Sequence, residues 1–183
     1  MSAPKLSPLA FKTRRQMALG LGLGALLPWV RAQAQSTSEA ALEAMAPAMP
    51  RVGDVLKVPP IRLLNEQDFQ HERQPLLLYW WSSTCPFCAL QSPSMQALWQ
   101  SQKSRGLRML ALSIDKKSED AQAYLQKRGY TFPSAWASPE WRKQFAKPKG
   151  LPITLVMDSR QKVLLAEKGQ MFAEDVEAIA RLL

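Results

Sequence analysis

The chain has 183 residues, enough for one domain of ordinary size plus an extension, because single domains usually run to about 100–150 residues. The formal net charge is +9, but residues 35–183 hold 19 basic against 15 acidic residues and carry only +4, which does not favour nucleic acid binding. The two cysteines are too few for a disulfide scaffold or a four-cysteine zinc site, and with His71 as the only histidine the usual mixed Cys/His sites are excluded too.

Residues 1–34 have the three parts of a secretory signal peptide. A basic stretch contains Arg14 and Arg15, an apolar run covers residues 17–30, and small residues lead up to Ala34. The apolar run has 14 residues, fewer than the ~20 that a helix needs to cross a membrane. We therefore predict cleavage after Ala34 and no stable membrane span in the mature protein.

The segment Thr13–Leu19 resembles a twin-arginine export signal, and Arg31 near the cleavage site fits that route. An ordinary secretory signal or a membrane anchor is the alternative. A paired arginine before an apolar run implies a bacterial protein exported to the periplasm, where disulfide chemistry is permitted.

Residues 35–51 are rich in Ala, Ser, Met and Pro and predict a flexible linker, so we expect the domain to cover residues 52–183. Within it, residues 76–80 form a continuous apolar run after a proline. Such a run is typical of a strand buried on both faces, and we expect it to be the central strand.

A helix is expected over residues 86–104, with Pro93 kinking it. Another buried strand follows at residues 107–114. Ser118 is suited to cap a helix that stops at Gly129.

The end of the chain changes character. Residues 153–157 and 163–167 predict two short strands joined by a tight turn, and residues 173–183 predict a last helix. Together, the elements indicate an α/β fold.

The sequence Cys85-Pro-Phe-Cys88 stands where the central strand passes into the first helix. The free N–H groups and the dipole at a helix N-terminus favour an anion, so Cys85 is expected to be the reactive thiolate. Pro86 has the backbone angle of a first helical residue, which supports Cys85 as the cap. Cys88, one turn on, is expected to be shielded and to act as the resolving thiol.

This arrangement predicts thiol–disulfide exchange without a cofactor: the Cys85 thiolate attacks a substrate disulfide and Cys88 cleaves the mixed disulfide. An inert disulfide is the plainer alternative, although a three-residue loop constrains little of the unfolded chain. Metal binding by the pair alone is a further alternative.

Three stretches resemble the thioredoxin superfamily, in particular the TlpA/ResA-type periplasmic thiol–disulfide oxidoreductases. They are residues 79–88, similar to the family's aromatic-Trp-Ala-x-x-Cys-x-x-Cys; Pro93, similar to the proline that kinks the active-site helix; and residues 150–158, similar to Gly-x-Pro-x-Thr-x-x-x-Asp. The resemblance implies a thioredoxin-like fold with a central mixed sheet and helices on both faces.

The resemblance also implies a cis Leu151–Pro152 bond, with the main chain of a protein substrate pairing beside Leu151. It places Trp81 near the disulfide, while Trp80 is expected in the core on the opposite side of the sheet. The implied partners are protein thiols or disulfides and a membrane electron-transfer protein.

Several positions depart from the family pattern. Thr84 stands where the family usually has Trp, Gln91 where many members have Glu, and Tyr79 where thioredoxin has a buried Asp. Both acidic groups that could handle the proton of the second thiol are therefore missing. Pro86 and Phe87 between the cysteines also resemble the dipeptide of some disulfide oxidases and isomerases, so the dipeptide leaves the direction of electron flow open. A reductase is expected, with a disulfide oxidase or isomerase as the alternative.

Other functions fit less well. A peroxiredoxin would need a proline seven residues before its cysteine, where Cys88 has Trp81. Copper chaperones of related fold use C-x-x-x-C with a distant histidine, whereas His71 lies upstream in a polar stretch typical of a solvated loop. A binding module regulated by its cysteines also stays open. Four aromatic residues are expected in the core rather than on a partner surface: Phe132, Trp136, Trp141 and Phe145.

Overall fold

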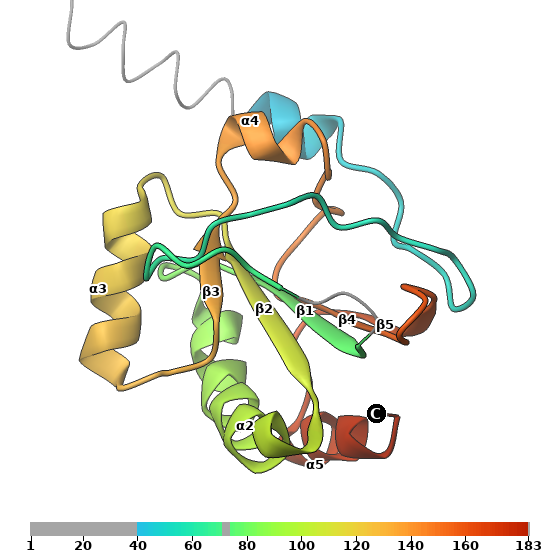
Figure 1. Cartoon of the computed structure of the whole chain (residues 1–183). Helices are drawn as coiled ribbons and strands as arrows, with labels where there is room; N and C mark the ends of the chain where they lie inside the picture. Colours follow the sequence, from blue (N-terminus) through green and yellow to red (C-terminus); the bar gives the residue numbers. More distant parts are fainter. Residues whose placement is uncertain (1–39, 71–73, 183) are drawn as a thin grey trace, which may run out of the picture. The chain divides into compact units, whose positions relative to one another are not determined.

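The computed structural model describes residues 40–70 and 74–182 (Figure 1). The predicted signal peptide at residues 1–34 and His71 lie outside the described residues. Within the described ranges, no helix is both long enough and apolar enough to cross a membrane.

A mixed five-stranded sheet forms the centre of the domain, in the order β3-β2-β1-β4-β5. β1 (Leu76–Trp81) lies in the middle, parallel to β2 (Arg108–Ser113) and antiparallel to β4 (Ile153–Met157). β3 (Ser134–Trp136) and β5 (Val163–Lys168) form the edges. All six residues of β1 are buried, which confirms the predicted central strand.

The helices surround this sheet (Figure 1). They are α2 (Pro86–Gln102), α3 (Ser118–Arg128), α4 (Pro139–Arg142) and α5 (Ala173–Ala178), with 3₁₀ turns at Lys103–Arg105 and Ile179–Arg181. One face of the sheet packs against α2, α3 and α5. The other packs against α4 and the loop segments that precede β1.

The alternation along β1 sends its two tryptophans to opposite cores, as expected. Trp81 belongs to the core that includes Cys88, and Trp80 to the other. Trp80 stacks on Phe145 with ring centroids 6.1 Å apart, and Trp141 packs against both rings. Trp141 and Phe145 thus pack, partly buried, against the core to which Trp80 belongs.

The end of α3 is as predicted, but its start is not. Gly129 ends the helix with a φ of 67°. The predicted cap at Ser118 is wrong, because the extended residue Lys117 is the N-cap and Ser118 is already the first helical residue. The Ser118 hydroxyl donates instead to the Glu119 carboxylate.

Residues before the expected domain start also contact the domain. Residues 40–44 are helical, and the Glu43 carboxylate accepts the Gly150 N–H at 2.9 Å and pairs with Lys147 Nζ at 3.0 Å. The Lys147 side chain is only 5% exposed, so its charge needs such a partner. This part of the predicted linker is therefore held against the domain.

Candidate active site

Cys85 is the N-cap residue of α2. Its backbone is extended, Pro86 occupies the first turn, and Cys85 Sγ accepts the N–H of Cys88 at 3.2 Å. This is the placement that the Cys-Pro-x-Cys spacing predicts. The cap sulfur therefore lies among the free N–H groups of the first turn, where a negative charge is stabilised.

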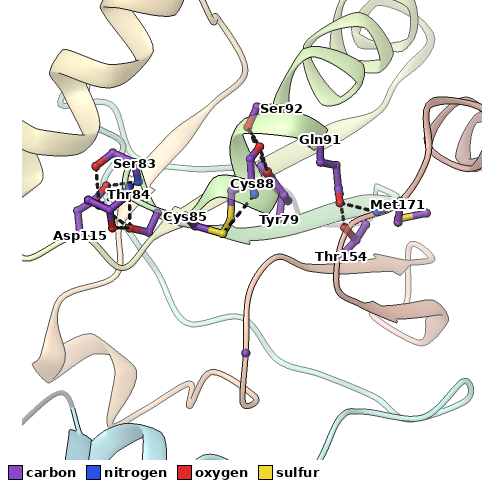
Figure 2. Close-up of a disulfide and its surroundings, with 12 residues drawn as sticks. Tyr79, Ser83, Thr84, Cys85, Cys88, Gln91, Ser92, Asp115, Thr154 and Met171 are labelled. Carbon is purple, nitrogen blue, oxygen red and sulfur yellow. Dashed lines mark hydrogen bonds between the residues drawn. A yellow bond between two sulfur atoms is a disulfide. The ribbon is translucent and has the colours of Figure 1, made fainter.

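Cys85 and Cys88 form a disulfide, with their Cα atoms 5.2 Å apart (Figure 2). Cys88 is 1% exposed, whereas Cys85 is half-buried and lines a surface groove. An incoming sulfur can therefore reach Cys85 but not Cys88.

The surroundings of Cys88 offer hydroxyl groups. Tyr79 Oη donates to the Cys88 carbonyl at 3.2 Å and is also hydrogen-bonded to Ser92 Oγ, which donates to the same carbonyl at 2.7 Å. Burial raises the pKa of Tyr79 far above its usual value, despite the opposing hydrogen bond from Ser92. Tyr79 therefore stays protonated at neutral pH.

Gln91 joins three elements beneath the disulfide. It is fully buried, its Nε2 donates to Thr154 Oγ1 in β4, and its Oε1 accepts the N–H of Met171 just before α5, both at 2.9 Å (Figure 2). All of these groups are neutral, so Gln91 links α2, β4 and the segment before α5 without a charge.

The groove beside Cys85 has a volume of about 790 Å³. Its walls come from the loop after β1, the loop after β2, α3 and Leu151. The Leu151–Pro152 bond is cis, as the resemblance implied, and Leu151 shares the groove with Cys85. The structure thus brings together two predicted site residues that are 66 positions apart in the chain.

The supporting residues have unequal positions. Trp81 is fully buried and packs on Tyr124, with ring centroids 5.4 Å apart. Thr84 is exposed and hydrogen-bonded to Ser82 Oγ at 3.0 Å. Phe87 is 56% exposed beside the cap, so its ring is available to a partner rather than part of the core.

Sequence reasoning missed Asp115, a buried carboxylate in the loop after β2. It accepts hydrogen bonds from the residues that precede Cys85 (Figure 2). A signal was available: an acid directly after one buried strand should lie near the residues that follow a parallel neighbour strand, because parallel strands end at the same edge.

A metal site is not apparent within residues 40–70 and 74–182, where no group of three or more His, Cys, Asp or Glu side chains could hold an ion.

Comparison with known proteins adds a family match and a shared fold. Residues 60–167 match the model of the AhpC/TSA family. The thiol-disulfide oxidoreductase ResA of Geobacillus kaustophilus (strain HTA426) is 24% identical over 102 residues, which cover 56% of this chain and 59% of that protein. The chain thus spans less than two thirds of this curated relative.

Two solved structures have similar folds. One is a putative thiol:disulfide interchange protein DsbE from Chlorobium tepidum, with a TM-score of 0.62, 24% identity, and coverage of 72% of this chain and 94% of the other. The second is a secreted disulfide oxidoreductase of Mycobacterium tuberculosis, with a TM-score of 0.60, 14% identity, and coverage of 69% and 96%. These likenesses establish the thioredoxin-like fold.

Proposed function

We infer the function from one premise: the chain belongs to the AhpC/TSA family, whose model matches more than half of its length. On this fold, we propose that it is a thiol–disulfide oxidoreductase that exchanges disulfides with protein substrates. One observation carries the proposal: a half-buried cysteine caps a helix and is bridged to a buried cysteine one turn on. This asymmetry gives the two sulfurs different tasks.

The proposed reaction starts from the reduced dithiol. The Cys85 thiolate attacks one sulfur of the substrate disulfide, forming a mixed disulfide and releasing one substrate thiolate, which takes a proton from solvent. Cys88 then loses its proton and attacks Cys85 Sγ, which releases the second substrate thiolate. Two electrons pass to the substrate, and the enzyme is left with the Cys85–Cys88 disulfide.

We propose reduction of substrates as the working direction. Strong oxidants of this fold owe their potential to a stabilised reduced form. Here the Cys88 N–H donates a hydrogen bond to Cys85 Sγ, and the acidic residue Asp115 is among the residues that line the groove beside Cys85. A nearby negative charge disfavours the thiolate and so supports a more reducing pair.

Leu151 and Pro152 are proposed to bind the main chain of the substrate. Their support is the cis bond and the position of Leu151 on the groove wall that contains Cys85. Trp81, Thr84, Pro86 and Phe87 are proposed to support the site, and no cofactor or metal is needed.

We also propose that residues 1–34 direct export to the periplasm by the twin-arginine route, and that a membrane electron-transfer protein returns the Cys85–Cys88 disulfide to the dithiol. Both proposals rest on the sequence pattern and on the family resemblance. Processing would be tested by mass spectrometry of the periplasmic protein, where a first residue other than Gln35 would contradict cleavage after Ala34.

The activity is tested with a disulfide-bonded protein substrate and excess dithiol. Cys85→Ser is expected to abolish turnover, and Cys88→Ser to accumulate a mixed disulfide that mass spectrometry detects. Turnover that survives Cys85→Ser would refute the proposed mechanism.

The direction is tested by equilibrating the protein in thiol/disulfide buffers. A reduction potential well below the ~−120 mV of a strong periplasmic oxidant supports a reductase, and a value near it supports an oxidase or isomerase.

A further inference from the structure

Asp115 is a buried carboxylate held by neutral donors. It is 6% exposed. Its Oδ1 accepts Ser82 Oγ at 2.7 Å, Ser83 Oγ at 2.8 Å and the Ser83 N–H at 3.0 Å, and its Oδ2 accepts Ser113 Oγ at 2.8 Å. Among the ion pairs of the described residues, none involves Asp115. Its charge is therefore balanced by hydrogen bonds and not by a cation.

Most of these hydrogen bonds come from the loop that leads into Cys85. Ser82 Oγ also accepts the Thr84 N–H at 3.3 Å, and the Ser82 carbonyl accepts the Cys85 N–H at 3.2 Å. The carboxylate thus fixes the residues on which the position of the cap sulfur depends. Figure 2 shows Asp115 against Ser83 and Thr84, on the side of Cys85 away from Gln91.

The network also joins two strands across the sheet. Ser113 pairs with Trp81 in the parallel register of β1 and β2, and Asp115 follows two residues later. The Asp115 carbonyl accepts the indole N–H of Trp136 from β3 at 2.8 Å. The anchor of the Cys85 loop is therefore itself held to two strands by hydrogen bonds, to Ser113 of β2 and to Trp136 of β3.

Asp115 lines the same groove as Cys85. The other charged groups of that groove are Lys116 after β2, and Asp120 and Lys127 on α3; Tyr124 on α3 is the remaining titratable group. These three charged side chains are exposed, so solvent screens them. Asp115 is buried, so its charge is screened less than those of the three exposed side chains.

We propose that Asp115 is the positioning residue of the active site: it holds the Ser82–Thr84 loop that presents Cys85, and its charge disfavours the Cys85 thiolate. The inference rests on the proposed role of Cys85 as nucleophile. It adds to that role a group whose negative charge counteracts the stabilisation of the Cys85 thiolate by the N-terminus of α2.

The charge is tested in a Cys88→Ser background, where Cys85 is the only thiol. The rate of alkylation by iodoacetamide against pH gives the pKa of Cys85 without any protein substrate. Asp115→Asn removes the charge and keeps one acceptor oxygen, and Ser113→Ala is the matched control, which removes a donor and keeps the charge. We expect Asp115→Asn to lower the pKa of Cys85 by about half a unit or more, and Ser113→Ala not to lower it.

An unchanged or raised pKa of Cys85 in Asp115→Asn would overturn the role of the charge, and so would an equal fall in Ser113→Ala. The holding role is tested by hydrogen exchange of the Ser83 amide, which we expect to be at least ~10-fold faster in Asp115→Ala. Unchanged exchange in that variant would overturn it, and if the variant does not fold, slower protein-disulfide reduction in Ser83→Ala replaces this readout. Loss of turnover in Cys85→Ser decides the proposed function separately.

Discussion

The contact between Glu43 and the loop before Pro152 predicts a loss of stability in Glu43→Gln. One carboxylate oxygen accepts the Gly150 N–H and the other pairs with Lys147 Nζ, which also donates to the Pro148 and Gly150 carbonyls. A glutamine has a single acceptor oxygen, so when that oxygen accepts the Gly150 N–H, its amide N–H groups face the Lys147 ammonium. Lys147 then keeps the Pro148 and Gly150 carbonyls as partners and loses the negative charge of Glu43.

The magnitude follows from burial. Breaking a fully buried ion pair costs about 3–5 kcal/mol, and an exposed pair is worth about 0–1 kcal/mol. Lys147 is 5% exposed and Glu43 40%, so the pair is intermediate and we expect a loss of about 1–2 kcal/mol at neutral pH.

The loss should depend on pH. Burial by itself would raise the pKa of Glu43, but the hydrogen bonds from Gly150 and Lys147 outweigh it and hold the pKa below its ordinary value. A lowered pKa in the folded state means that the contribution is complete above the unfolded value and disappears as pH falls through the folded value. The difference between Glu43→Gln and the parent should therefore vanish in acid.

The assay is urea unfolding of the full chain at neutral and acidic pH. Glu66→Gln is the matched control, because Glu66 forms a 3.7 Å ion pair with Arg62 in which both side chains are mostly exposed, and it should cost less than about 0.5 kcal/mol. Equal effects of the two substitutions at neutral pH, or a loss in Glu43→Gln that persists in acid, would refute the reasoning.

Two further substitutions test the buried contacts of Gln91 and the backbone conformation of Gly150. Gln91→Leu should destabilise the fold by about 2–4 kcal/mol in urea unfolding, because the buried N–H of Met171 and hydroxyl of Thr154 would lose their partner; a loss below about 1 kcal/mol would contradict this. Gly150→Ala should cost about 1–2 kcal/mol, since Gly150 has a φ of +94° and an added Cβ would lie 3.0 Å from Lys168 Cε; an unchanged thermal midpoint would show that the loop relaxes freely.

The central strand and the helix after it were predictable because their signals are local. A continuous apolar run predicted β1 as the middle strand, and Cys85 followed by Pro86 marked the helix start that the structure has. The edge strand β3 has only three residues, Ser134–Trp136, and the first is polar. This segment is too short to show the alternation of apolar residues that predicts a strand.

The contacts that local patterns missed depend on residues far apart in the chain. Glu43 lies in a stretch whose composition indicates a linker, and its partners are more than 100 residues away. The role of Asp115 appears only once β1 and β2 are paired in register. The exposure of Phe87 could not be predicted either, because helical spacing places an apolar residue on a face of the helix but does not show whether a neighbouring element covers it.

The two edge strands of the sheet matter for a protein that is proposed to bind the extended main chain of other proteins. An open edge strand can pair with any extended chain and lead to aggregation. Here β3 has only three residues and already bridges to Leu63, and β5 ends in the exposed charged pair Glu167 and Lys168. Both edges are therefore poor templates for a further strand, which favours extended chains docking at the groove beside Cys85 and leaving again, without adding to the sheet.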